Sequence, residues 1–115
     1  MDVVVYLGKA LICFANLCHP ALIGTDTRPG DYTMAVLETS QPGYGGDVLM
    51  YDSNEEEWYA IHRTYTRDRR RDRSILYDGT TPAQRRVTAG CVNVEPDVYD
   101  RLRRDYSTSR LVILP

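Results

Sequence analysis

A cysteine and a histidine in this sequence have the residue types and the surroundings of a covalent acyl-transfer pair. Cys91 follows Gly90 at the end of a polar stretch and precedes apolar Val92, and His62, one of two histidines, lies in an apolar run of strand type. In covalent acyl transfer an imidazole takes the thiol proton and the thiolate attacks a carbonyl carbon. If the fold brings the two residues together, the protein is a cysteine enzyme; otherwise Cys91 is a buried structural cysteine beside a turn glycine.

Gly90 has a possible role of its own in that chemistry. A thiol is mostly protonated at neutral pH, so Cys91 needs a base such as His62 or nearby positive charge. We expect Gly90 to let the backbone turn sharply, so that neighbouring N–H groups point at a developing oxyanion.

The composition is that of one globular domain, which we expect to span residues 1–115. The formal net charge of −2 favours neither a nucleic acid nor an anionic membrane as partner. No apolar run approaches the about 20 residues that cross a bilayer. The first residues have a strand pattern rather than that of a secretory signal.

The chain has three cysteines, so at least one thiol is unpaired within it. Cys13 and Cys18 are close enough in sequence to face each other across a hairpin, or they are two small buried apolar residues. A zinc site built from Cys13, Cys18 and His19 would need a fourth ligand that the sequence does not supply. We therefore assign no metal and no cofactor.

Short apolar runs alternate with turn signals along most of the chain, which is typical of a mostly β domain. One helix is expected after Cys91: Pro96 suits its first position, Asp97 its positive end, and Val98 and Leu102 share one face. The expected strands are residues 1–7, 10–14, 18–23, 31–38, 48–51, 58–62 and 111–114.

Residues 64–86 are a long polar stretch between two strand-like regions. Arginines alternate there with Asp68 and Asp72, at positions Arg67, Arg69, Arg70, Arg71 and Arg73. Connections of this length inside a compact domain are usually lids, binding loops or mobile segments. A solvated loop in which the arginines and aspartates pair with each other is the alternative interpretation.

Three segments together resemble the L,D-transpeptidase catalytic domain (YkuD-like) of bacterial cell-wall enzymes. Residues 22–34 are similar to that family's Gly…Thr-Pro-x-Gly-x-Tyr/Phe segment, residues 60–63 to its Ile-His-Gly, and residues 88–93 to its Ser-x-Gly-Cys-Ile/Val-Arg/Asn. A helix and a final strand follow the cysteine in the same order. The resemblance implies a β-sandwich of mixed sheets with one main helix after Cys91.

The resemblance also implies roles for individual residues. Cys91 would be the nucleophile, His62 its general base, and Gly90 part of the oxyanion site. The backbone carbonyl of Arg63 would orient the imidazole, and Thr88 would support the cysteine loop. Tyr59 and Thr88 would border the substrate, and Arg69, Arg70 and Arg71 are expected to bind its carboxylates in bidentate pairs. Ala89 stands where many members carry a second histidine, and Asn93 where Arg is more frequent.

For such an enzyme the partners are peptidoglycan tetrapeptide stems, and the location is periplasmic or secreted. The thiolate would expel the terminal D-alanine, and an amine or water would release the resulting thioester, which gives an L,D-transpeptidase or an L,D-carboxypeptidase. A secreted antibacterial effector with the same chemistry, countered by a cognate inhibitor protein, is an alternative. A non-catalytic β module that binds an anionic partner through the arginine-rich stretch is another. A papain-like protease is disfavoured because there the cysteine precedes the histidine.

Overall fold

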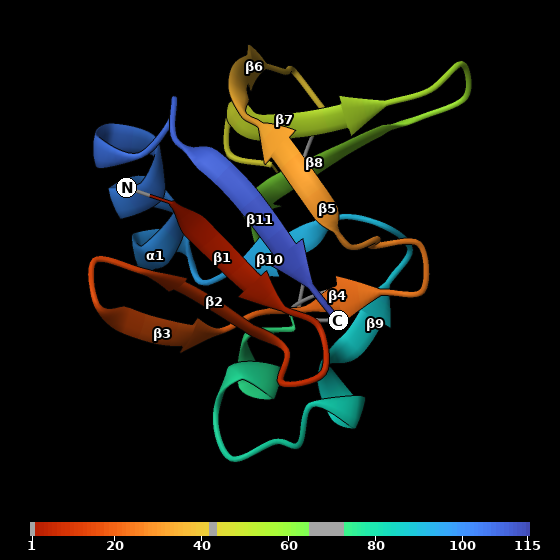
Figure 1. The fold of residues 1–115 in the computed structure, drawn as a ribbon, viewed down its shortest axis with the longest axis vertical. Coiled ribbons are helices and arrows are strands. Elements are labelled where there is room, and N and C mark those ends of the chain that lie inside the picture. Colours follow the sequence, from red (N-terminus) through yellow and green to blue (C-terminus); the bar gives the residue numbers. More distant parts are fainter. Residues whose placement is uncertain (1, 42–43, 65–72) are drawn as a thin grey trace.

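A computed structural model describes residues 2–41, 44–64 and 73–115. The chain forms a five-stranded sheet in the order β3-β2-β1-β11-β5, a four-stranded sheet in the order β10-β8-β7-β6, and a parallel pair of β4 with β9 (Figure 1). Both larger sheets are mixed, because β1 pairs in parallel with β11 and β10 in parallel with β8, whereas their other neighbours are antiparallel. The predicted mostly β fold with mixed sheets is confirmed.

The elements follow one another closely along the chain. They are β1 (Val3–Tyr6), β2 (Leu11–Phe14), β3 (Leu17–Pro20), β4 (Ile23–Gly24), β5 (Gly30–Thr33), β6 (Ala35–Glu38), β7 (Asp47–Ser53), β8 (Trp58–Arg63), the 3-10 turns η1 (Ser74–Tyr77) and η2 (Ala83–Arg85), β9 (Arg86–Thr88), β10 (Val92–Val94), the helix α1 (Pro96–Asp105) and β11 (Arg110–Leu114). The expected helix and closing strand are both present.

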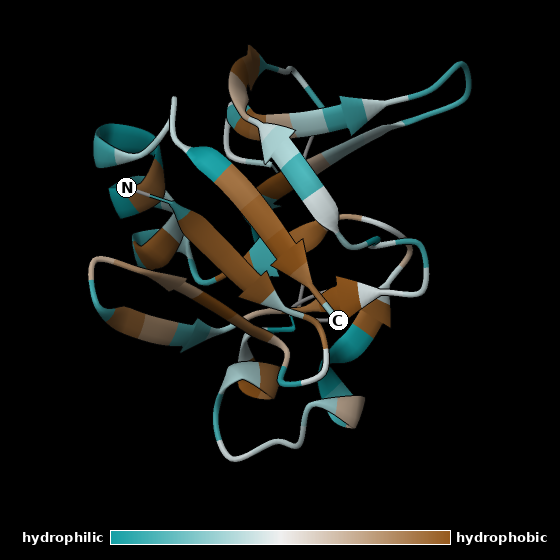
Figure 2. Cartoon of the chain, viewed as in Figure 1, coloured by the Kyte–Doolittle hydropathy of each residue, from teal (hydrophilic) through white to brown (hydrophobic). Residues whose placement is uncertain are grey.

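The core lies between the two larger sheets and the helix. Alternate residues of β1 and β11 are fully buried, as the two-residue period of a half-covered strand requires. Val98, Tyr99 and Leu102 of α1 join the same apolar cluster as β1, β8 and β10. Figure 2 shows the apolar colour along β1 and β11 and the polar colour at the tip of the β7–β8 hairpin.

The expectation of a single strand over residues 31–38 is wrong, because strand structure is interrupted at Met34. β5 pairs with β11 in the five-stranded sheet, whereas β6 pairs with β7 in the four-stranded sheet. Met34 between them is buried in the core. Strands that change sheet in this way form the corners of β-sandwiches, so this segment joins the two layers.

The long polar stretch is attached to the body of the protein through Arg85. Its side chain is only 6% exposed, and its guanidinium donates hydrogen bonds to the carbonyls of Lys9, Ala10 and Thr80 at 2.8–3.3 Å. A buried charge needs such partners to offset its loss of hydration. Arg85 therefore holds η2 against the β1–β2 turn. Residues 65–72, with Arg67, Arg69, Arg70 and Arg71, lie outside the described residues.

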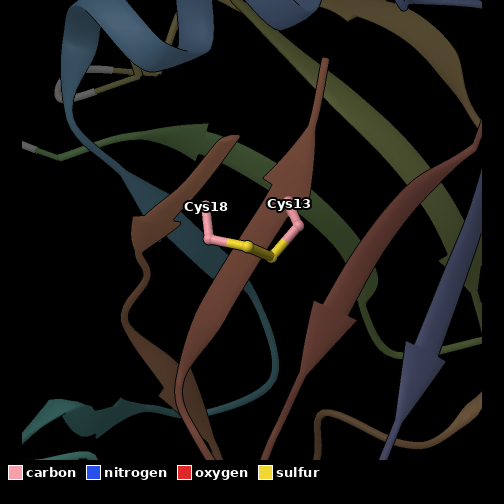
Figure 3. The surroundings of a disulfide bond; sticks show 2 residues. All are labelled: Cys13 and Cys18. Atoms are coloured by element: carbon pink, nitrogen blue, oxygen red, sulfur yellow. A yellow bond between two sulfur atoms is a disulfide. The ribbon is translucent and has the colours of Figure 1, made fainter. Parts of the chain in front are cut away.

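Cys13 and Cys18 form a disulfide, which decides between the two sequence interpretations (Figure 3). The two cysteines are register partners on the antiparallel strands β2 and β3. Cys91 is the remaining free thiol. Among the described residues, no helix is long and apolar enough to cross a membrane.

We predict that the disulfide contributes modestly to stability, because it closes a loop with a sequence separation of only five residues. The double variant Cys13→Ser/Cys18→Ser should lower the free energy of unfolding by about 2 kcal/mol. Urea unfolding with and without dithiothreitol measures this: the reductant should destabilise the wild type by a similar amount and leave the double variant unchanged. Equal sensitivity of both proteins to the reductant would contradict the prediction.

Candidate active site

The parallel pairing of β8 with β10 brings His62 and Cys91 close together. Val92 is the register partner of Ile61, and Asn93 that of His62. Cys91 therefore lies beside Ala60, on the strand face that Ala60 shares with His62. His62 and Cys91 both line one cavity of about 440 Å³. Segments far apart in the sequence thus place an imidazole and a thiol on one wall.

The imidazole of His62 is held by its own strand. His62 is 9% exposed, and its Nδ1 lies 2.9 Å from the carbonyl oxygen of Arg63. A carbonyl can only accept, so Nδ1 carries the hydrogen and Nε2 is the basic nitrogen. Burial lowers the pKa of His62; the bond to Arg63 opposes this shift, and the charge of Arg73 adds to it. His62 is therefore neutral at pH 7 and able to accept a proton.

The thiol of Cys91 is half-buried and is also neutral in the resting protein. Burial raises the pKa of Cys91, a hydrogen bond from the Ala60 backbone lowers it in part, and the charge of Glu57 raises it further. Burial disfavours the charged form of each group, which moves the two pKa values in opposite directions. The resting pair is consequently thiol and imidazole rather than thiolate and imidazolium.

The loop before Cys91 is tied to the rest of the protein at two carbonyls, those of Ala89 and Gly90, and is braced by one hydrogen bond within itself. The carbonyl of Gly90 accepts hydrogen bonds from the Thr27 hydroxyl at 2.9 Å and from the Tyr51 hydroxyl at 3.1 Å, both within the interior. Thr88 Oγ1 donates to the Cys91 carbonyl at 2.6 Å. The N–H of Asp26 donates to the Ala89 carbonyl at 2.9 Å. These bonds fix the backbone that carries the thiol.

Glycine is required at position 90 for a reason other than the expected sharp turn. The positive φ values of the described glycines belong to Gly30, Gly45, Gly46 and Gly79, so Gly90 has an ordinary backbone conformation. A Cβ at this position would lie 2.5 Å from Cε1 of Tyr59, closer than any tolerable contact. Gly90 therefore allows the Tyr59 ring to pack directly on the cysteine loop.

Only the backbone carbonyl of Arg63 faces the imidazole. The guanidinium of Arg63 turns away from it, pairs with Asp47 of β7 and with Asp100 of α1 at 3.0 Å each, and covers the Tyr99 ring of α1 at 4.2 Å. It also donates to the Tyr44 carbonyl at 3.1 Å. The side chain thus joins β8 to the helix and to the loop that carries Tyr44.

The cavity contains most of the predicted site residues and others that sequence reasoning missed. Tyr59, Thr88, Gly90, His62 and Cys91 all line it. Arg73 contributes the only guanidinium among its described lining residues, whereas Arg69, Arg70 and Arg71 lie outside the described part of the chain. The predicted role of those three arginines stays a prediction.

Tyr44 is a lining residue that the sequence did not single out, whereas Asn93 was noted there only as the last residue of the cysteine motif. The Tyr44 ring meets the His62 ring edge-on with centroids 4.7 Å apart, so it covers the imidazole. Asn93 is 6% exposed, and its Oδ1 has no hydrogen-bond partner among the described residues. Tyr44 lies in a segment read only as a glycine-rich loop, and no pattern distinguishes it there.

We predict that Gly90→Ala costs about 1–3 kcal/mol of stability through overpacking against Tyr59. In a Tyr59→Ala background the same substitution should cost clearly less, because the clashing ring is gone. Urea unfolding of the four proteins gives this coupling directly.

Gly24→Ala is the matched control for that cycle. A Cβ at Gly24 would lie 2.1 Å from the Thr88 carbonyl oxygen, and removal of the Tyr59 ring does not relieve a backbone clash. An equal cost of Gly90→Ala in both backgrounds would contradict the packing explanation.

Comparison with solved structures shows a shared fold at low sequence identity. An L,D-transpeptidase from Xylanimonas cellulosilytica matches 97% of this chain at a TM-score of 0.57 and 16% identity, and Mycobacterium tuberculosis L,D-transpeptidase 1 matches 99% at 0.52 and 12%. Bd1075 from Bdellovibrio bacteriovorus matches 97% at 0.53 and 18%. This chain spans 59%, 61% and 47% of the lengths of those three chains, respectively.

No protein-family model matches the sequence, and neither does any curated protein. The structural matches cover nearly the whole of the described fold. The chain therefore has the fold of the L,D-transpeptidases, which confirms at the level of the fold the resemblance that its motifs indicated.

Proposed function

We propose that this protein is a cysteine acyltransferase of L,D-transpeptidase type that acts on peptidoglycan stem peptides through a thioester on Cys91. The observation that carries the proposal is the pairing of β8 with β10, which puts His62 and Cys91 on one wall of a cavity. The fold shared with L,D-transpeptidases supports the choice of reaction class.

The first step is proton transfer from the Cys91 thiol to Nε2 of His62. The bond from Nδ1 to the Arg63 carbonyl leaves the basic nitrogen available. Since both groups are neutral at rest, the thiolate forms as it attacks, and the imidazolium that results is stabilised by the Arg63 carbonyl. Attack on the substrate carbonyl and loss of the terminal D-alanine then leave the thioester.

The oxyanion of that attack needs backbone donors. The peptide between Gly90 and Cys91 has its carbonyl bound to Thr27 and Tyr51. In a trans peptide the N–H points opposite to the carbonyl, so the Cys91 N–H is directed away from those two hydroxyls. We assign this N–H to the oxyanion, where a fixed donor is worth most.

One cationic group in the cavity suits a peptide substrate that carries carboxylates. Arg73 has the bidentate geometry that a carboxylate prefers, and it lines the same cavity as Cys91.

We place the protein in the periplasm or outside the cell. The disulfide between Cys13 and Cys18 supports this location, because such bonds persist in oxidising compartments and are rare in the cytosol.

We predict that D-alanine release from a purified disaccharide-tetrapeptide follows the protonation of His62. As the pH increases, the rate should rise around the pKa of His62, which lies below the ordinary value of 6.5, because His62 must be neutral to act as base. It should then stay level until Cys91 ionises above its ordinary value of 9.0. Mass analysis of the products over pH 4–10 provides the rate, and distinguishes hydrolysis, exchange and cross-linking.

His62→Gln should lower that rate by about a hundredfold or more. His19→Gln is the matched control, since His19 stacks on Phe14 and is absent from the cavity lining; this variant should keep the wild-type rate. Full activity of His62→Gln would exclude His62 as the base.

A further inference from the structure

The side chains of His62 and Arg63 leave β8 on opposite faces, as successive residues of a strand do, yet both contact one short segment. This is the Tyr44 segment, residues 44–46, which leads into β7. The Tyr44 ring meets the His62 ring with centroids 4.7 Å apart. Arg63 Nη1 donates hydrogen bonds to the carbonyls of Tyr44 and Gly45 at 3.1 and 3.4 Å. The Tyr44 segment therefore connects the guanidinium of one residue to the imidazole of its neighbour.

The guanidinium of Arg63 is itself fixed, which is a condition for holding anything else. It forms ion pairs with Asp47 and Asp100 and lies over the Tyr99 ring. The side chains of Arg63 and Asp47 are only 20% and 16% exposed, and solvent screens a partly buried pair less than an exposed one. The motif that residues 60–63 resemble has glycine at the last position, and a glycine could make none of these contacts.

Gly45 allows the Tyr44 segment to lie directly on the guanidinium. A Cβ at Gly45 would lie 2.9 Å from Nη1 of Arg63 and 3.0 Å from its Cδ. The next residue, Gly46, also has a positive φ, +104° against +76° for Gly45. A Cβ at Gly46 would nevertheless meet no atom within 4 Å. The close approach to Arg63 is thus made by Gly45 and not by Gly46.

We propose that the side chain of Arg63 is a positioning residue for the general base, because it holds the Tyr44 segment so that the Tyr44 ring stays against the imidazole of His62. The ring covers one side of the imidazole and restricts its rotation, while the Arg63 carbonyl binds Nδ1. Arg63 does not belong to the described lining of the cavity, so its side chain acts only through Tyr44. This inference rests on the proposed function, because a base needs positioning only if His62 activates Cys91.

Arg63→Ala should lower kcat for D-alanine release about tenfold, since a small displacement of a catalytic group is costly. KM should change little, because Arg63 does not line the cavity. Arg63→Lys should restore part of kcat, because an ammonium can pair with Asp47 but lacks the planar fork of a guanidinium. In a Tyr44→Leu background, Arg63→Ala should have almost no further effect on kcat. Losses that multiply in the double variant would overturn the proposal.

Arg103→Ala is the matched control for the loss of an arginine. Arg103 pairs with the other carboxylate oxygen of Asp47 at 3.0 Å, and its hydrogen bond goes to that carboxylate rather than to the Tyr44 segment. This variant should keep the wild-type kcat. A loss as large as that of Arg63→Ala would show that the ion-pair network matters only for stability, and would overturn the proposal.

A pair of glycine variants tests the same contact while Arg63 stays in place, and so covers the case in which Arg63→Ala does not fold. Gly45→Ala and Gly46→Ala both add a Cβ at a positive φ, but only the first presses on the guanidinium. Gly45→Ala should lower kcat as Arg63→Ala does, and Gly46→Ala should keep it near the wild-type value. Equal values of kcat in the two variants would overturn the proposal.

A spectroscopic measurement separates failure of this inference from failure of the proposed function. If the wild type releases no D-alanine, the proposed function falls, and the positioning is judged by NMR alone. The ring protons of His62 lie in the ring current of Tyr44, so their chemical shifts report the contact between the two rings. Arg63→Ala should move these resonances towards their positions in Tyr44→Leu, and Arg103→Ala should leave them in place. Unchanged His62 resonances in Arg63→Ala would overturn the inference whatever the activity.

Discussion

The parallel ladder between β8 and β10 is the constraint on which the candidate site depends. It fixes His62 opposite Asn93 and sets Cys91 beside Ala60, although the long polar stretch separates the two strands in sequence. β10 is held on its other edge by paired hydrogen bonds with Leu22 at 2.8 and 2.9 Å. Because a strand has a period of two residues, a slip of one position would turn the thiol to the opposite face.

The ladder positions the residues, and burial sets their protonation. Desolvation pushes the pKa of Cys91 up and that of His62 down, so the resting site carries no ion pair. A neutral pair avoids the cost of two buried charges. In the proposed reaction, negative charge would develop only during attack, close to a backbone peptide whose carbonyl is already bound by Thr27 and Tyr51.

The same interior hydrogen bonds connect the site to a second cavity of about 220 Å³, whose lining includes Asp26, Arg28 and Asp52. Tyr51 binds the Gly90 carbonyl and lines the second cavity, and Tyr59 packs on Gly90 and lines both. A single short loop thereby contacts the walls of both cavities. A separate tie through Arg63, Asp47 and Tyr99 holds the end of β8 against the helix.

Local patterns in the sequence were enough to predict most of the strands and the helix. The apolar runs predicted both strands of the disulfide hairpin, although the return strand expected over residues 18–23 ends at Pro20 and residues 23–24 form β4 in another sheet. Pro96 and Asp97 marked the start of the helix. The break at Met34 was missed because both halves of that segment have strand-like composition, and only the tertiary arrangement assigns them to different sheets.

The candidate site likewise contains residues that the sequence predicted and residues that only the structure revealed. Cys91, His62 and Thr88 follow from motifs because their residue types are rare or lie at characteristic spacings. Tyr44 and the second cavity depend on contacts between distant segments, which no local pattern encodes. The reason for Gly90 was likewise hidden, since the ring that requires it belongs to Tyr59 on another strand.

The most direct test of the central claim is intact-mass analysis of the protein mixed with a disaccharide-tetrapeptide and quenched in acid within seconds. The account predicts a covalent adduct equal to the donor minus D-alanine, mapped to Cys91, absent in Cys91→Ala and strongly reduced in His62→Gln. Donor turnover without any adduct on Cys91, or the same adduct yield in His62→Gln, would contradict it.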